Sequence, residues 1–96
     1  MDLGLTIKKI RKEKGLTQGE FATACGITQT YLSQIENNQK EPNLSTLKKL
    51  SDALGLPLPI LFFLSMNEDD VRPNKRKAFN QINPAIKSLV SELFNL

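Results

Sequence analysis

Histidine and tryptophan are absent from the 96-residue sequence, and cysteine occurs once, as Cys25. Because histidine is the most frequent general base and metal ligand near neutral pH, its absence argues against an enzyme and against a metal site. A single thiol forms neither an internal disulfide nor a four-ligand zinc site, and the helical position of Cys25 predicts that it lies in the core. We therefore expect a protein without enzymatic activity, metal or cofactor, in a reducing compartment.

Long hydrophobic runs are also missing from the sequence. The most extended apolar stretch, residues 56–64, contains Pro57 and Pro59 and is far shorter than the roughly 20 residues that a membrane helix needs. The residues from Met1 to Gly4 do not begin the basic and then apolar pattern of a secretory signal. These absences predict a cytoplasmic protein with no membrane partner.

The composition that remains is that of a small globular chain. Hydrophobic residues make up 40% of the sequence and charged residues 24%, which is typical of a folded domain rather than of a disordered segment. The formal net charge of +3 is compatible with an anionic partner but is too small to establish one.

The order of apolar residues predicts an all-α fold, because they recur at helical spacing and no segment alternates as a strand does. The first amphipathic helix is expected over residues 5–14. Thr17 and Glu20 have the spacing of a capping box and are expected to begin a second helix. Gly26 is expected to end that helix in a left-handed conformation.

Three more helices follow before the pattern changes. Thr28 is the expected N-cap of a third helix, and Asn43 is the expected N-cap of a fourth. A short fifth helix, opened by Pro57 or Pro59, is predicted to run through Leu64, because proline is tolerated in the first turn of a helix.

The chain is predicted to divide into a domain, a linker and a terminal helix. The five helices occupy residues 1–64. Residues 65–78 lose the apolar pattern, change from acidic to basic, and are interpreted as a linker. Residues 79–96 regain the helical pattern, most clearly from Pro84 onward, and are expected to form a sixth helix.

The second and third helices satisfy the steric demands of a helix-turn-helix. Counted from Gln18, the small residue Ala22 falls where the two helices touch, and Gly26 falls in the turn. The shared apolar seam consists of Phe21, Cys25, Ile27, Leu32 and Ile35. Because all of these positions agree in register, the pattern predicts a helix-turn-helix rather than an ordinary helical hairpin.

These residues resemble the lambda-repressor-like, Xre-type helix-turn-helix family. The resemblance runs from Leu3 to about Leu64 and is carried by the stretch IKKIRKEKGLTQGEFATACGITQTYLSQIENNQKEPNLSTLKKLSDALGL. It implies a five-helix DNA-binding domain whose third helix docks in the major groove of double-stranded DNA. The sequence departs from the family at Gly19 and at Asn37-Asn38, where many members have an arginine and a glycine.

The resemblance assigns the outer face of the third helix to base reading and its surroundings to the DNA backbone. The candidate base-reading residues are Gln29, Thr30, Ser33 and Gln34. The candidate phosphate contacts are Gln18, Tyr31, Asn37, Asn38, Gln39, Lys40 and Arg11. Glutamine amides suit adenine and threonine methyls suit thymine, which favours a half-site containing A·T pairs. Two alternatives stay open: Arg11 can pair with Glu36, and Tyr31 can pack on the domain surface.

An apolar stripe in the sixth helix predicts a homodimer through residues 79–96. The stripe consists of Ile82, Ile86, Leu89, Val90, Leu93 and Phe94. One helix-turn-helix contacts too few bases to be selective, whereas a two-fold dimer reads two half-sites about one helical turn, roughly 34 Å, apart. The alternative is that this C-terminal dimerisation helix folds back on its own domain.

The sequence thus leads to the hypothesis of a sequence-specific transcriptional regulator, a dimeric repressor on a palindromic operator. Its expected partners are double-stranded DNA and a second copy of the chain. The alternative is a protein-interaction module with the same fold, which the weak charge of the third helix favours. Glutamine and threonine at the reading positions favour the regulator, because such side chains match base edges.

Overall fold

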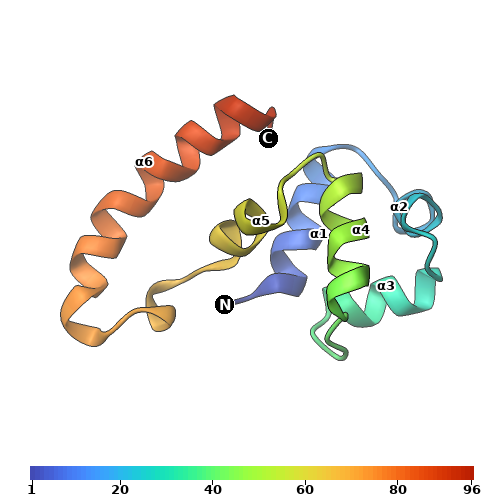
Figure 1. Ribbon diagram of the computed structural model, residues 1–96, viewed down its shortest axis with the longest axis horizontal. Helices are drawn as coiled ribbons and strands as arrows, with labels where there is room; N and C mark the ends of the chain where they lie inside the picture. The colour runs from blue at the N-terminus through green and yellow to red at the C-terminus, as the bar shows by residue number, and fades with distance from the viewer.

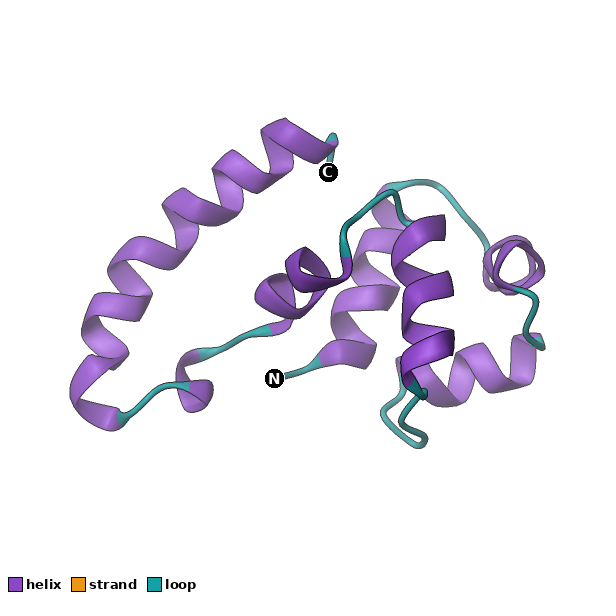
Figure 2. Cartoon of the chain, viewed as in Figure 1, coloured by secondary structure: helices purple, strands orange, loops and turns teal.

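The computed structural model describes residues 1–96, which form helices, turns and loops without a strand (Figures 1 and 2). The helices are α1 (Leu3–Glu13), α2 (Gln18–Cys25), α3 (Gln29–Glu36), α4 (Leu44–Ala53), α5 (Leu58–Ser65) and α6 (Arg76–Phe94). Two short 3-10 turns, η1 (Glu68–Asp70) and η2 (Pro73–Lys75), precede α6. The predicted all-α fold class is confirmed. None of the helices combines the length and the apolar character needed to cross a membrane.

Helices α2, α3 and α4 begin at the predicted capping residues, and α2 also ends at the predicted glycine. Thr17 Oγ1 accepts a hydrogen bond from the Glu20 N–H, and the Glu20 carboxylate accepts one from the Thr17 N–H, which completes the capping box. The bond from the Thr17 backbone lowers the pKa of the Glu20 carboxyl below its ordinary value. Gly26 ends α2 with a φ of 67°, a left-handed conformation that the lack of a β-carbon permits. Thr28 and Asn43 cap α3 and α4.

Helices α1 to α5 enclose one hydrophobic core. Its 11 buried residues are Ile7, Ile10, Phe21, Ala22, Cys25, Leu32, Ile35, Leu50, Leu54, Leu56 and Leu61. Burial raises the pKa of the Cys25 thiol, which keeps it protonated and unreactive and confirms its predicted place in the core. Because α2 contacts α3 and α4 while α3 also contacts α1, the core holds the two helices of the helix-turn-helix in a fixed relative position.

Asp2 and Asn38 join the start of α1 to the end of α3, and α1 therefore begins earlier than the sequence pattern predicts. The Asp2 carboxylate accepts hydrogen bonds from the Leu5 N–H at 3.0 Å and from the Asn38 amide at 2.8 Å. The bond from Asn38 is the main reason that the pKa of Asp2 lies below its ordinary value. Asn38 Oδ1 in turn accepts from the Gly4 N–H at 3.1 Å. Asn38 thus joins α1 to the end of α3 through both ends of its amide, and its assignment as a phosphate contact stays a prediction.

Gly4 lies where α1 touches the end of α3, and we expect Gly4→Ala to destabilise the fold. A β-carbon there would clash with the backbone oxygen of Ile35 and would lie 2.9 Å from the backbone oxygen of Glu36. Because backbone atoms yield less readily than side chains, the free energy of unfolding should fall by about 1 to 3 kcal/mol in urea titrations. The control is Gly19→Ala, whose β-carbon would make only ordinary contacts and is expected to be neutral or stabilising. Equal losses in the two variants would contradict this prediction.

Helix α6 starts at Arg76, earlier than the pattern predicts, and includes Pro84 in its interior. The turn η1 supports this early start. Arg76 Nε donates to the backbone oxygen of Glu68 at 3.0 Å, and the Asn80 amide donates to the Glu68 carboxylate at 2.7 Å. Pro84 lacks the N–H that would donate within the helix, and the helix continues past it to Phe94. The end of the predicted linker is therefore helical.

Helix α6 lies toward one end of the long axis of the molecule, and α2 and α3 lie at the other end (Figure 1). One side of α6 packs on the chain itself, because Val90 is buried and Phe94 contacts the hydrophobic core. The structure thus corrects the assignment of these two residues to a dimer interface, since the side of α6 that carries them faces the protomer. The residues left exposed on α6 are Ile82, Ile86, Leu89 and Leu93.

Candidate nucleic-acid interface

Helices α2 and α3 direct their apolar side chains inward and leave a polar surface outside. The buried apolar side chains are Phe21, Ala22 and Cys25 on α2 and Leu32 and Ile35 on α3. The turn between the helices is closed by the Ile27 N–H, which donates to the backbone oxygen of Ala22 at 3.0 Å. Because the core uses one face of each helix, the opposite face of α3 is free to carry polar residues.

A polar hollow of about 440 Å³ lies between the start of α2, the outer face of α3 and the loop after α3. Its lining residues are Gln18, Gln29, Thr30, Ser33, Gln34 and Gln39, and none of them is apolar. Their amide and hydroxyl groups both donate and accept hydrogen bonds, and none is charged. The structure therefore brings the four candidate base-reading residues together with two of the candidate phosphate contacts on one surface.

A buried charged network lies behind the polar hollow and connects α1, α2 and α3. Arg11 Nε donates to Glu36 Oε2 at 2.7 Å, and Arg11 Nη2 donates to Glu36 Oε1 at 3.0 Å. Arg11 Nη1 donates to the backbone oxygen of Leu16 at 2.7 Å. Gln18 Nε2 also donates to Glu36 Oε1, at 3.1 Å, so the network orients a residue of the hollow.

This network decides between the two alternatives for Arg11. All three guanidinium nitrogens of Arg11 are bonded within the protein, and the residue is only 5% exposed. A phosphate would have to compete with these bonds and reach a buried group. The assignment of Arg11 as a phosphate contact is therefore corrected to the structural pairing with Glu36.

The other candidate phosphate contacts lie in different surroundings. The backbone N–H groups of Gln39 and Lys40 both donate to the backbone oxygen of Gln34, at 2.8 Å and 3.3 Å, which turns the loop back toward α3. Lys40 and Asn37 are exposed next to this turn. Tyr31 is half-buried and packs against the hydrophobic core, which agrees with the alternative that it packs on the domain.

Sequence reasoning missed the two backbone carbonyls that hold the polar hollow in shape. The Leu16 carbonyl accepts from Arg11, and the Gln34 carbonyl accepts from the loop that carries Gln39. Every residue has a backbone carbonyl, so a pattern of side chains contains no signal for such an acceptor. Only the folded arrangement shows which carbonyls are used.

Comparisons with known proteins agree with this geometry. The ImmF control region 10 kDa protein of Bacillus phage phi105 is 46% identical over 59 residues, which are 62% of this chain and 66% of that protein. The Immunity repressor protein of the same phage is 43% identical over 56 residues, which are 58% of this chain and 39% of that protein. The matched part of the chain thus spans less than two thirds of the length of either relative.

Solved structures and a family model give the same result. SinR, the master regulator for biofilm formation, solved in complex with DNA, is similar with a TM-score of 0.59 and 38% identity. The match covers 62% of this chain and 97% of the SinR chain in that structure. The family model described as helix-turn-helix, HTH_3, matches residues 7–61. Because this match covers more than half of the sequence, the chain belongs to the lambda-repressor-like, Xre-type family of helix-turn-helix proteins.

Proposed function

We propose that this protein is a sequence-specific DNA-binding transcriptional regulator of the cytoplasm, acting as a homodimeric repressor on a palindromic operator. The observation that carries the proposal is the polar hollow, where six uncharged hydrogen-bonding residues meet on the exposed side of a helix-turn-helix. Membership of the helix-turn-helix family supports it. Further support comes from SinR, which was solved in complex with DNA, and from the phage relative named an immunity repressor.

In this proposal α3 enters the major groove and its outer face reads base edges. The amides of Gln29 and Gln34 pair with adenine, and the Thr30 methyl contacts thymine. Gln18, held by Glu36 at the start of α2, lies where free backbone N–H groups and the positive end of the helix dipole favour a phosphate. Lys40 supplies a cation beside the hollow. Residues 1–64 would thus bind DNA, while residues 79–96 would join two copies.

Base reading predicts a sequence-dependent loss of affinity when the glutamines are removed. Gln29→Ala and Gln34→Ala should each weaken binding to a selected site by about 1 to 3 kcal/mol, while binding to unrelated duplexes should change little. Lys40→Ala is the matched control, because loss of a phosphate contact weakens binding to all sequences alike. The site is obtained by selection from random duplex DNA, and affinities are measured by gel shift at fixed salt.

Two results would contradict this function. Equal losses on selected and unrelated duplexes in the glutamine variants would exclude base reading by Gln29 and Gln34. If the wild-type protein selects no sequence at all, the protein-interaction module with the same fold becomes the better account of the uncharged α3 surface.

A further inference from the structure

Helix α6 carries apolar residues on two sides, and only one of these sides packs against the rest of the chain. Val90 and Phe94 pack on the chain's own domain, whereas Ile82, Ile86, Leu89 and Leu93 are 54%, 39%, 57% and 67% exposed. These four residues, named the α6 seam below, follow one another at steps of four, three and four positions. Alternating steps of four and three are those of the heptad repeat, by which two helices pack along their length.

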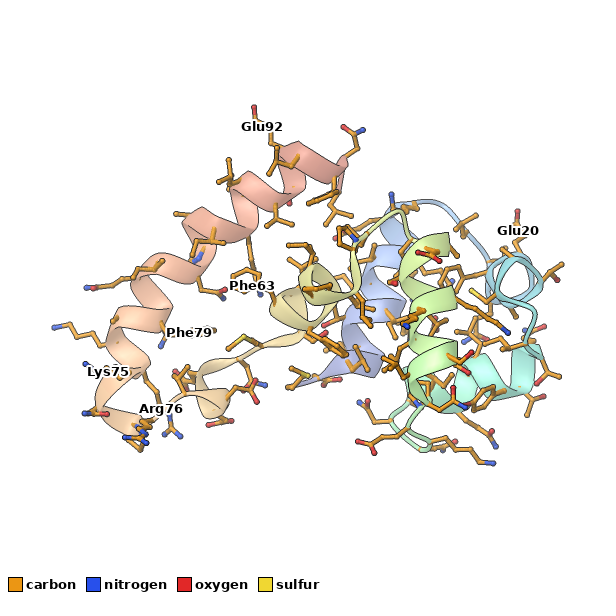
Figure 3. All side chains as sticks on the ribbon, viewed as in Figure 1. Glu20, Phe63, Lys75, Arg76, Phe79 and Glu92 are labelled. Atoms are coloured by element: carbon orange, nitrogen blue, oxygen red, sulfur yellow. The ribbon has the colours of Figure 1, made fainter.

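Charge on α6 favours a second copy of this chain as the occupant of the seam, in antiparallel orientation. Lys75 and Arg76 lie at one end of the helix and Glu92 lies near the other (Figure 3). Arg76 is paired with Asp69 at 3.7 Å, while Lys75 and Lys77 are exposed and form no ion pair. A parallel pair would place the two basic ends side by side. An antiparallel pair that superposes the two seams places Glu92 opposite Asn83 of the partner helix, about 9 Å along the axis from Lys77, whereas a parallel pair leaves about 22 Å between these two charges.

The position of α6 in the fold sets the distance between two reading helices in such a dimer. Along the long axis, whose extent is 41 Å, α6 lies at one end and α2 and α3 lie at the other (Figure 1). Helix α5 lies between α6 and α1, and α1 contacts both α5 and α3. Because a helix is about 10 Å across, the axes of helices at opposite ends of this extent lie roughly 30 Å apart, so α3 lies roughly 30 Å from a two-fold axis in the seam. The two copies of α3 are then roughly 60 Å apart.

We infer that the dimer joined through the α6 seam reads two half-sites separated by two helical turns of DNA rather than by one. Two turns correspond to roughly 68 Å or about 20 to 21 base pairs between half-site centres, and one turn to roughly 34 Å. This inference rests on the proposed function. It replaces the one-turn spacing expected from the sequence, because the seam and the polar hollow lie at opposite ends of the protomer.

The half-site spacing is measured by selection with the full chain from duplexes that contain about 40 random base pairs, enough for two half-sites at either spacing. The expected result is an inverted repeat whose half-site centres are about 20 to 21 base pairs apart. Insertion of about 5 base pairs between the half-sites rotates one of them to the opposite side of the duplex and should abolish paired binding. An inverted repeat with centres one turn apart, or a single unpaired half-site, would overturn the inference.

The seam is tested by Leu89→Asp, with Ser88→Asp as the matched control on the same turn of α6. Both residues are exposed in the protomer, so neither change disturbs the core. In sedimentation velocity, Leu89→Asp should be monomeric at concentrations where the wild type and Ser88→Asp are dimers. Its affinity for the paired site should fall by about 100-fold or more, while its affinity for one half-site is unchanged.

The two measurements separate the failure of the inference from the failure of the proposed function. If Leu89→Asp remains a dimer, the α6 seam is not the interface and the inference is overturned, even if the protein binds DNA. If the wild type selects no sequence, the proposed function fails and the two-turn spacing fails with it. In that case sedimentation still decides whether the seam joins two copies.

Discussion

Glu36→Ala should lower the free energy of unfolding by about 3 to 5 kcal/mol, because it leaves a buried charge without a partner. Arg11 is 5% exposed and directs two of its nitrogens at the Glu36 carboxylate. Without that carboxylate the guanidinium keeps only its bond to the Leu16 carbonyl, at a site that is 5% exposed to solvent. Gln18 also loses its acceptor, so the change should loosen one wall of the polar hollow as well.

Urea denaturation followed by circular dichroism measures this loss, and two variants serve as controls. Asp69→Ala removes a partner from the exposed pair with Arg76 and should cost less than about 1 kcal/mol. The double variant Arg11→Met with Glu36→Leu removes both buried charges and should recover much of the stability that Glu36→Ala loses. If Glu36→Ala costs no more than Asp69→Ala, the buried network does not hold α1 against α3.

Phe21→Ala should destabilise the protein by about 3 to 5 kcal/mol, because Phe21 is the largest fully buried side chain and its truncation leaves a cavity in the core. Phe21 belongs to α2, a helix of 8 residues that contacts only α3 and α4 extensively. A helix this short is not stable by itself and depends on such packing. Loss of Phe21 should therefore loosen the packing of α2 and, with it, the position of Gln18 in the wall of the polar hollow.

Thermal unfolding tests this prediction, since 1 kcal/mol shifts the midpoint of a domain of this size by about 4 to 8 °C. The midpoint should fall by more than about 12 °C in Phe21→Ala. Phe63→Ala is the control, because Phe63 is half-buried on α5 and should lose less. Similar losses in both variants would mean that the core is not centred on Phe21.

The polar hollow shows how far residue patterns predict a functional surface. Gln29, Thr30 and Gln34 follow a capped helix start, so their common exposed face could be predicted from helical periodicity alone. The joining of Gln18 to this face could not, because it depends on a bond to Glu36 across two helices. Arg11 illustrates the same limit: sequence leaves it free to contact phosphate or to pair, and only burial decides.

The sequence by itself determined the all-α class, the capped starts of α2, α3 and α4 and the helix-turn-helix, because capping residues, glycine turns and apolar spacing act over a few neighbouring positions. Tertiary structure decided which of these positions remain available to a partner. Arg11 pairs with Glu36 in the interior, Val90 packs inward, and the α6 seam stays exposed on a helix at the other end of the molecule from α3. Such outcomes depend on contacts between residues distant in sequence, which a local pattern does not encode.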